Sequence, residues 1–214
     1  KVKFYTGLYH ALLGRGLASD VNGAYPRNDG SVGQLPMKEG TPLYNIYNTD
    51  AAWGAQWNLS QLWILAYPEY MSEYISSHLQ AYKDAGWLAD GLANNRYVSG
   101  VGTNLLSTII AGAYECGIRD FDTNIAYEAC LKNELEGKNR PFGAGKVNTT
   151  EFVKYGYVPH QDAGEGYHET FMFSASHTLE YSYSAWAVAQ WAKQLGDEAH
   201  YSQLMDLSKG WERL

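Results

Sequence analysis

Residues Asn48 to Trp63 place one carboxylate, Asp50, among three tryptophans and contain no lysine or arginine. A carboxylate accepts strong hydrogen bonds from hydroxyl groups, and an indole offers an apolar face with a polar edge. Trp53 and Trp57 are four residues apart and would share one helix face. The pattern predicts either a sugar-binding wall or a core helix capped by Asp50. In the first case we expect Trp53 to be exposed and Trp57 to pack inside.

Four further residues could contact a hydroxylated ligand. Trp87 and Asp90 lie in the stretch GWLADG, although an aspartate before glycine is also a common turn former. Asn104 precedes a predicted helix, as either a ligand-facing amide or a neighbour of the helix cap. Glu180 lies near the start of another helix between apolar flanks. Support of a site from a partly buried position is the preferred role of Glu180, and direct sugar contact is the second.

The composition favours a neutral ligand over a charged polymer. Of 214 residues, 18% are charged and 14% are aromatic, with a formal net charge of -7. Typical globular proteins have about 25% charged residues, and no basic patch for nucleic acid is evident. The length suits one domain with a substantial core. The six histidines have no metal-binding spacing such as HExxH, so no metal site is predicted among them: His10, His78, His160, His168, His177 and His200.

The hydrophobic period predicts seven helices, whose caps and stops are read from aspartate, threonine, proline and glycine. Thr49 or Asp50 would cap the second helix, Asp120 or Asp122 the fifth, and Asp197 the seventh. Residues 17–47 and 87–102 are predicted as loops, and 137–173 as irregular with one short extended element at Phe152–Val158. The predicted helices are Val2–Leu13, Ala51–Ala66, Pro68 to Gly86, Thr103 to Gly117, Phe121–Leu135, Ser176–Leu195 and Asp197 to Leu214.

The sixth predicted helix is apolar on two flanks, so it needs neighbours on every side. The seventh is still periodic at Leu214. We therefore expect a fragment of a larger all-α domain, with Lys1 as a processing or cloning boundary. Cys116 and Cys130 are either two buried thiols or a disulfide bridge. No apolar run reaches the roughly 20 residues of a membrane helix.

Several stretches, in order, resemble glycoside hydrolase family 92. They are FYTGLYHALL, SDVNGAYPRNDG, NTDAAWGAQWNLSQLWILAYPE, GWLADG, GVGTNLLSTIIAGAYECGIRDFD and SASHTLEYSYSAWAVAQWAKQLG. The resemblance implies a calcium-dependent, exo-acting, inverting α-mannosidase, bacterial and either secreted or periplasmic. The family has an N-terminal β-sandwich followed by an (α/α)6 barrel. Residues 1–214 resemble the N-terminal half of that barrel, so about seven helices in antiparallel hairpins are expected.

The resemblance also implies roles for individual residues. Asp50 matches the family aspartate of a Trp-Asp-Thr-x-Arg segment, whereas Trp53 stands where that segment has arginine. The loss of this cation changes which substituents on the sugar are tolerated, so mannose linkage specificity is expected to differ. Together with the residues identified above from their types and positions, the expected substrate-binding set is Asp50, Trp53, Trp57, Trp87, Asp90, Asn104 and Glu180.

The catalytic pair is expected outside these residues. The acid of the family resembles a glutamate in Glu-Gly-Asn-x-Trp-Gln-Tyr, and the base an aspartate in Gly-Asn-Asp-Asp; neither segment occurs here. Most Ca²⁺ ligands are also expected outside these residues. The resemblance thus implies part of an enzyme that removes terminal α-mannose from glycans, as in N-glycan degradation, and an inactive isolated chain. The competing interpretation is a non-catalytic glycan-binding or structural α-helical module.

Overall fold

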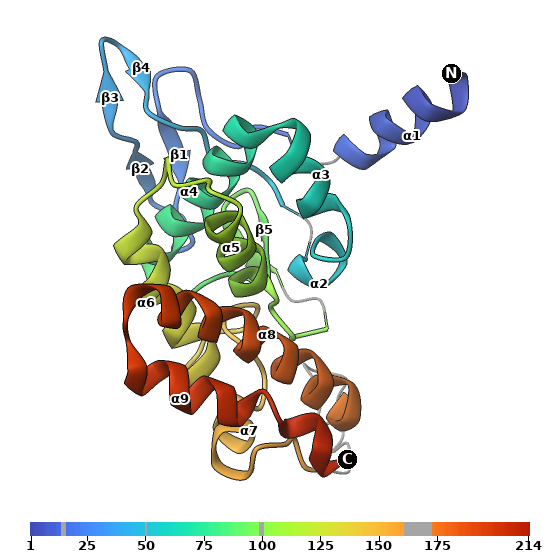
Figure 1. Cartoon of the computed structure of the whole chain (residues 1–214). Helices are drawn as coiled ribbons and strands as arrows, with labels where there is room; N and C mark the ends of the chain where they lie inside the picture. The colour runs from blue at the N-terminus through green and yellow to red at the C-terminus, as the bar shows by residue number, and fades with distance from the viewer. Residues whose placement is uncertain (14–15, 50, 99–100, 161–172) are drawn as a thin grey trace.

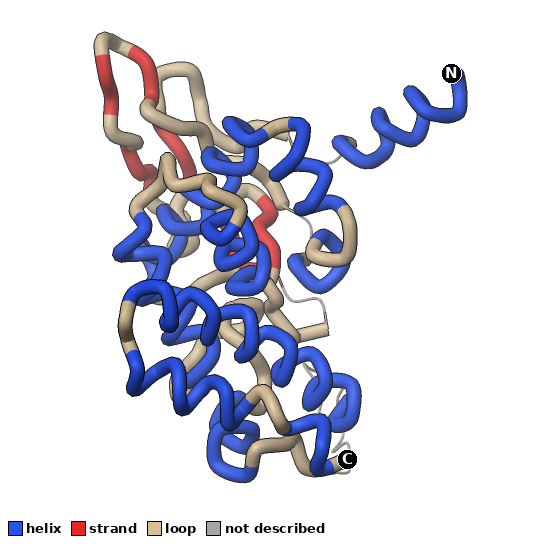
Figure 2. Tube along the Cα trace, viewed as in Figure 1, coloured by secondary structure: helices blue, strands red, loops and turns tan. Residues whose placement is uncertain are grey.

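The computed structural model describes residues 1–13, 16–49, 51–98, 101–160 and 173–214. Within these ranges helices dominate, and strands form only three separate two-stranded sheets (Figures 1 and 2). The all-α class predicted from the hydrophobic period is therefore confirmed. No helix in the described ranges combines the length and the hydropathy needed to cross a bilayer.

The first helix, α1 (Val2–Leu12), matches its predicted range to one residue. None of its residues is buried, and the helix extends away from the rest of the molecule (Figure 1). Phe4, Tyr5 and Tyr9 are each more than half exposed. The described part of the chain thus leaves an aromatic helix without a packing partner.

Two segments predicted as loops contain short antiparallel hairpins, so the expectation of one short extended element is wrong. Left-handed residues form two of the turns, Glu39-Gly40 and Asn94-Asn95. Two-residue turns with positive φ match the twist of paired strands, which explains why these turn signals mark hairpins. The pairs are β1 (Ala24–Pro26) with β2 (Val32–Gln34), β3 (Met37–Lys38) with β4 (Thr41–Pro42), and β5 (Gly91–Ala93) with β6 (Arg96–Val98).

The helix predicted over Ala51–Ala66 is interrupted. Helix α2 (Ala52–Ala55) ends at Gln56, and α3 (Leu59–Ala66) begins three residues later. The Gln61 side-chain amide donates to the Gln56 carbonyl at 3.0 Å. A side-chain donor thereby occupies a carbonyl near the break, which favours a non-helical backbone there.

The expected cap of this helix also needs correction. The N-cap residue of α2 is Ala51, without a side-chain capping bond. Thr49 Oγ1 instead accepts from the backbone N–H of Leu92 at 2.9 Å. Thr49 therefore joins two loops and does not cap α2. Asp50, the other predicted cap, lies outside the described residues.

Helix α4 (Pro68–Ala85) has the predicted start and stop. Proline occupies its first turn, and Gly86 follows its end with φ 78°. Glycine adopts this left-handed conformation without the steric cost of a side chain. The predicted buried stripe is confirmed: Met71, Ile75, Leu79 and Tyr82.

The next two helices cross the middle of the molecule (Figure 1). Helix α5 (Leu106–Glu115) begins three residues after the predicted start, and α6 (Thr123–Leu135) begins two residues after. Of the two predicted caps for α6, the structure assigns the role to Asp122, whose carboxylate accepts from Ile125 N at 3.1 Å.

The prediction of a short extended element at Phe152–Val158 is wrong, because its first four residues are helical and the rest form no strand. Helix α7 (Thr149–Tyr155) is followed by Gly156 in the left-handed conformation. The Phe152 ring packs against Tyr181 at a centroid distance of 5.4 Å. Tertiary packing of this ring thus overrides the strand preference of a local aromatic and β-branched composition.

The C-terminal helices lie side by side (Figure 1). Helix α8 (Ser174–Leu195) ends before Gly196, as predicted. Asp197 caps α9 (Glu198–Leu207) by accepting from His200 N at 3.2 Å. The predicted continuous helix to Leu214 is broken, because a 3-10 turn, η2 (Gly210–Arg213), follows α9.

The two apolar flanks of α8 differ in burial. The flank with Tyr181, Ala185, Val188 and Ala192 is buried, and the first three of these side chains belong to the main core. On the other flank, Leu179 is 52% exposed, Tyr183 43% and Trp186 47%. A helix that is apolar all round but covered on one side agrees with the expectation of a larger helical domain.

The two cysteines are not bridged. Cys130 is buried and Cys116 is exposed, and both are free thiols. The preferred expectation of two buried thiols is therefore correct for Cys130 and wrong for Cys116. Residue 116 follows the last residue of α5, at the end where the helix turns into a loop.

Candidate sugar-binding site

Three loop segments meet beside the start of α2. The N–H of Ala52 donates to the carbonyl of Asp90 at 2.8 Å, and the N–H of Asp90 donates to Gly143 O at 3.0 Å. The N–H of Thr49 donates to Leu92 O at 2.8 Å. These bonds fix residues on either side of position 50 against the GWLADG stretch, although the two segments are about forty residues apart in sequence. Thr49 and Ala52 are thereby held beside Leu92 and Asp90.

The tryptophans of the opening stretch have different environments. Trp53 is 45% exposed and Trp57 is 64% exposed, whereas Trp63 is fully buried. The expectation that Trp57 packs inside is therefore wrong, and Trp63 fills the core position. Trp53 lies within α2, and Trp57 lies in the break that follows it, outside the regular helix.

The three loop segments that meet around Thr49, Asp90 and Gly143 are called the loop cluster below. Trp87 and Asp90 are buried within it. Trp87 is 8% exposed, with the Lys132 ammonium 4.5 Å from the centre of its ring. A side chain at Gly145 would meet this ring at 2.9 Å, so glycine permits the close approach. Asp90 is 1% exposed. In this structure neither side chain is exposed at the surface of the cluster.

Asn104 forms the turn before α5. Its backbone has φ 40°, a left-handed conformation that asparagine tolerates better than most residues. Its amide donates to the carbonyl of Leu88 at 3.0 Å, and its Oδ1 accepts from Leu106 N at 3.4 Å. The side chain is fully buried. Of its two expected roles, the structure gives Asn104 the local one at the helix start.

Glu180 is half-buried on α8. The adjacent Tyr181 hydroxyl donates to Val147 O at 2.6 Å and to Gly102 O at 3.3 Å, which holds this turn of α8 against the loops. Burial raises the pKa of Glu180, and the positive charge of Lys146 opposes that rise. A half-buried position beside the loops is the one expected for a residue that supports a site.

A buried polar cluster beneath the loops was not predicted. Glu134 on α6 and Lys146 before α7 form an ion pair at 2.5 Å, with each side chain 1% exposed. Ser184 on α8 donates to the same carboxylate at 2.6 Å. Burial lowers the pKa of Lys146, and the Glu134 carboxylate opposes that shift. The only hint in the sequence is a lysine between small residues in the stretch GAGKV, which is too weak to identify a pair.

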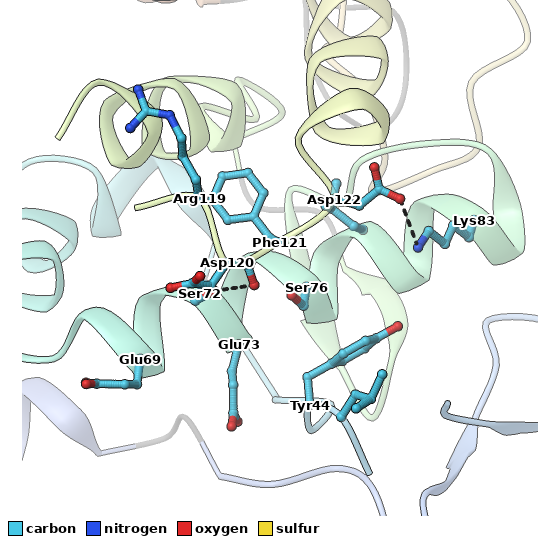
Figure 3. Close-up of a pocket in the computed structure, with 12 residues that line it drawn as sticks. Tyr44, Glu69, Ser72, Glu73, Ser76, Lys83, Arg119, Asp120, Phe121 and Asp122 are labelled. Carbon is cyan, nitrogen blue, oxygen red and sulfur yellow. Dashed lines mark hydrogen bonds and ion pairs between the residues drawn. The ribbon is translucent and has the colours of Figure 1, made fainter. Parts of the chain in front are cut away.

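A cavity of about 480 Å³ lies elsewhere, between α4 and the loop before α6 (Figure 3). Ser72 Oγ donates to the Asp120 carbonyl at 2.7 Å, and Lys83 pairs with Asp122 at 3.8 Å. Of the seven predicted site residues, the six that the structure describes do not line it. The side chains of Figure 3 thus belong to a different surface from the loop cluster.

The described residues contain no group of three or more histidine, cysteine or acidic side chains placed to hold a metal ion. His78 and His177 are buried, and desolvation lowers their pKa values to about 3 and about 4. Both imidazoles are therefore neutral near pH 7. His168 lies outside the described residues.

Comparison with known proteins places the chain among glycosidases. A family model described as the glycosyl hydrolase family 92 catalytic domain matches residues 1–214. A curated relative from Arthroderma benhamiae, named an uncharacterized secreted glycosidase, is 32% identical over 161 residues. The matched region is 72% of this chain and 20% of that relative.

Solved structures share the fold over nearly the whole chain. A family GH92 α-mannosidase from Bacteroides thetaiotaomicron, in complex with mannoimidazole, is 23% identical with a TM-score of 0.81, and the match covers 98% of this chain and 25% of that chain. A family GH92 inverting mannosidase from Bacteroides thetaiotaomicron VPI-5482 is 24% identical with a TM-score of 0.78, covering 99% and 27%. The predicted fold class, part of a helical barrel within a larger domain, is confirmed. The chain spans about a quarter of the length of these proteins.

Proposed function

The chain belongs to glycosyl hydrolase family 92, and on that premise we propose that it forms part of the catalytic domain of an α-mannosidase. The match of the family model to residues 1–214 carries this proposal. The likeness in fold to two mannosidases supports it. The proposed substrate is a terminal α-linked mannose of a glycan, such as an N-glycan, and the proposed stereochemical course is inversion.

Inversion requires two carboxyl groups about 6.5–9.5 Å apart, one to protonate the leaving oxygen and one to activate water. The segments that would supply this pair are absent from these 214 residues. The proposed contribution of this chain is therefore a wall of the sugar site. Trp53 and Trp57 would offer indole faces, and Asp50 would accept hydrogen bonds from sugar hydroxyls.

The remaining predicted residues would position this wall. Asp90 holds its loop against the start of α2, the Trp87 ring packs beside Gly145, and Asn104 ties the loop to α5. Glu180, with its raised pKa, lies on the helix turn that contacts Gly102 and is proposed to support the site. Trp53 replaces a cation in the family pattern, so a neutral sugar face is favoured over an anionic substituent.

A calcium ion is implied by the family resemblance. The described residues contain no group of three or more histidine, cysteine or acidic side chains placed to hold it. Most ligands for Ca²⁺ are proposed to come from residues of the protein outside this chain.

The location of the protein and the rest of its domain are also proposals. The relative from Arthroderma benhamiae is named as secreted, and we propose a secreted or periplasmic location for the protein that contains this chain. The exposed flank of α8 and the unpacked α1 are proposed to contact the remaining helices of the barrel. An N-terminal β-sandwich is proposed as a further part of the same protein.

The proposal is tested with an aryl α-mannoside and two samples: the natural full-length protein and residues 1–214 alone. We expect turnover by the full-length protein in the presence of calcium, and none by residues 1–214. The matching aryl β-mannoside controls for specificity. Turnover by residues 1–214 would place the catalytic pair within this chain. Glycan binding by the full-length protein without any turnover would favour the non-catalytic module.

A further inference from the structure

The buried pair of Glu134 and Lys146 joins three helices and a loop at one carboxylate. Lys146 Nζ donates to Glu134 Oε2 at 2.5 Å, and Ser184 Oγ on α8 donates to the same oxygen at 2.6 Å. Ser107 Oγ on α5 donates to the other oxygen, Oε1. Charged groups are costly to bury, and well-packed apolar residues often replace such pairs without loss of stability. Stability alone therefore does not explain this pair.

On the α6 side, the network reaches the turn that contains Asn104. Asn133 is adjacent to Glu134, and its amide donates to the carbonyl of Asn104 at 3.0 Å and to Ser107 Oγ at 3.1 Å. Asn104 is held at φ 40°, which most residues avoid. The position of this turn thus depends on α6 side chains next to the ion pair.

On the other side, the network reaches the turn of α8 that contains Glu180. Val147, adjacent to Lys146, donates from its N–H to Gly102 O at 3.0 Å and accepts from the Tyr181 hydroxyl at 2.6 Å. Ser184, which also contacts Lys146, is four residues after Glu180 and therefore lies on the same helix face. The charge of Lys146 accordingly acts on Glu180.

We propose that Glu134 and Lys146 are positioning residues of the sugar-binding site, which fix the Asn104 turn and the Glu180 turn of α8 relative to each other. They would act through these two turns and would not touch the sugar. This inference rests on the proposed function, because it assumes that the loop cluster forms a wall of the site. A small displacement of such a wall is expected to weaken turnover more than folding.

The test compares two variants of the natural full-length protein. Lys146→Met leaves the Glu134 carboxylate buried and unpaired, so a loss of thermal stability is expected. Lys146→Met combined with Glu134→Gln removes both charges and should recover most of the thermal midpoint. The recovered double variant should still show kcat on an aryl α-mannoside at least roughly tenfold below the unsubstituted protein, with a smaller change in KM. The control is Glu136→Gln with Lys138→Met, which removes the same charge types from exposed positions nearby in the sequence. It should change neither the thermal midpoint nor kcat.

Each outcome distinguishes a positioning role of Glu134 and Lys146 from a purely structural role. A double variant that recovers both the thermal midpoint and kcat would overturn the inference, because the pair would then be structural only. Should the double variant fail to fold, Ser184→Ala keeps both charges and removes the two contacts that Ser184 makes, one with each charged residue; unchanged kcat in this folded variant would also contradict positioning. If the unsubstituted protein does not turn over α-mannosides, the proposed function fails, and this inference fails with it. If the unsubstituted protein turns over α-mannosides and the double variant has the same kcat, the proposed function stands and only this inference fails.

Discussion

Trp57 and Trp63 are six residues apart, yet Trp63 is fully buried while Trp57 is 64% exposed. Trp57 lies in the break between α2 and α3, whereas Trp63 lies within α3. It releases Trp57 from the helix face that the sequence pattern predicts, whereas Trp63 packs against Tyr74 with ring centroids 4.9 Å apart. One stretch therefore contains a core tryptophan and two that face solvent.

This difference predicts opposite effects of two substitutions in the full-length protein. Trp63→Ala should cost about 3–5 kcal/mol of unfolding free energy, because it leaves a cavity in the core. Trp57→Ala should leave the unfolding free energy within about 0.5 kcal/mol and lower kcat/KM for a mannoside. Denaturant unfolding and steady-state kinetics measure the two quantities. Equal losses of stability would show that Trp57 is a core residue in the intact domain.

Asp50→Ala separates a sugar ligand from a helix cap. A carboxylate that accepts hydroxyl hydrogen bonds contributes about 1.5–3 kcal/mol, so kcat/KM should fall by about one to two orders of magnitude. A cap would instead cost about 1 kcal/mol of stability, with the kinetics of the folded protein unchanged. Thermal midpoint and kcat/KM are measured on the same preparation. A shift in the midpoint alone would assign Asp50 to capping.

Acid should destabilise the protein through His78. Burial lowers its folded pKa to about 3, below the ordinary value of 6.5, so the unfolded chain binds the proton first. The stability due to neutral His78 is full above about pH 6.5 and is lost as the pH falls toward 3, at up to about 1.4 kcal/mol per pH unit. Urea unfolding at several values of pH measures this slope. His78→Leu should show a slope smaller by about one proton; an unchanged slope would contradict the assignment.

The two thiols should differ in reactivity. Burial raises the pKa of Cys130 well above its usual value, and the thiolate is the reactive form. Cys116 is exposed. In the native protein, iodoacetamide should therefore modify Cys116 and spare Cys130, and both should react after denaturation. Peptide mass spectrometry locates the label. Protection of Cys116 in the full-length protein would show that another part of that protein covers the end of α5.

Much of the helical framework follows from local signals. Gly86, Asp122, Gly196 and Asp197 end or cap helices where the sequence predicts, because glycine and aspartate act on the nearest backbone groups. The helix missed at residues 149–155 depends on a distant contact. The α7 helix depends on Phe152 packing against Tyr181.

The candidate site was less predictable than the helices. The sequence indicates which residue types could bind a sugar, but burial of Trp87 and Asn104 depends on the meeting of loops far apart in the chain. The Glu134–Lys146 pair joins residues on separate elements, and neither residue belongs to a recognisable motif. A single sequence gives no signal for such a pairing, because each charge alone resembles an ordinary surface residue.

The stereochemistry of the sugar released by the natural full-length protein tests the central claim most directly. Proton NMR of the anomeric region, recorded within the first minutes of reaction with an aryl α-mannoside, identifies the first product before mutarotation. We predict β-mannose first, as expected when water attacks the face opposite the leaving group. First formation of α-mannose would contradict the inverting mechanism, and release of no mannose from any α-mannoside would contradict the assignment as an α-mannosidase.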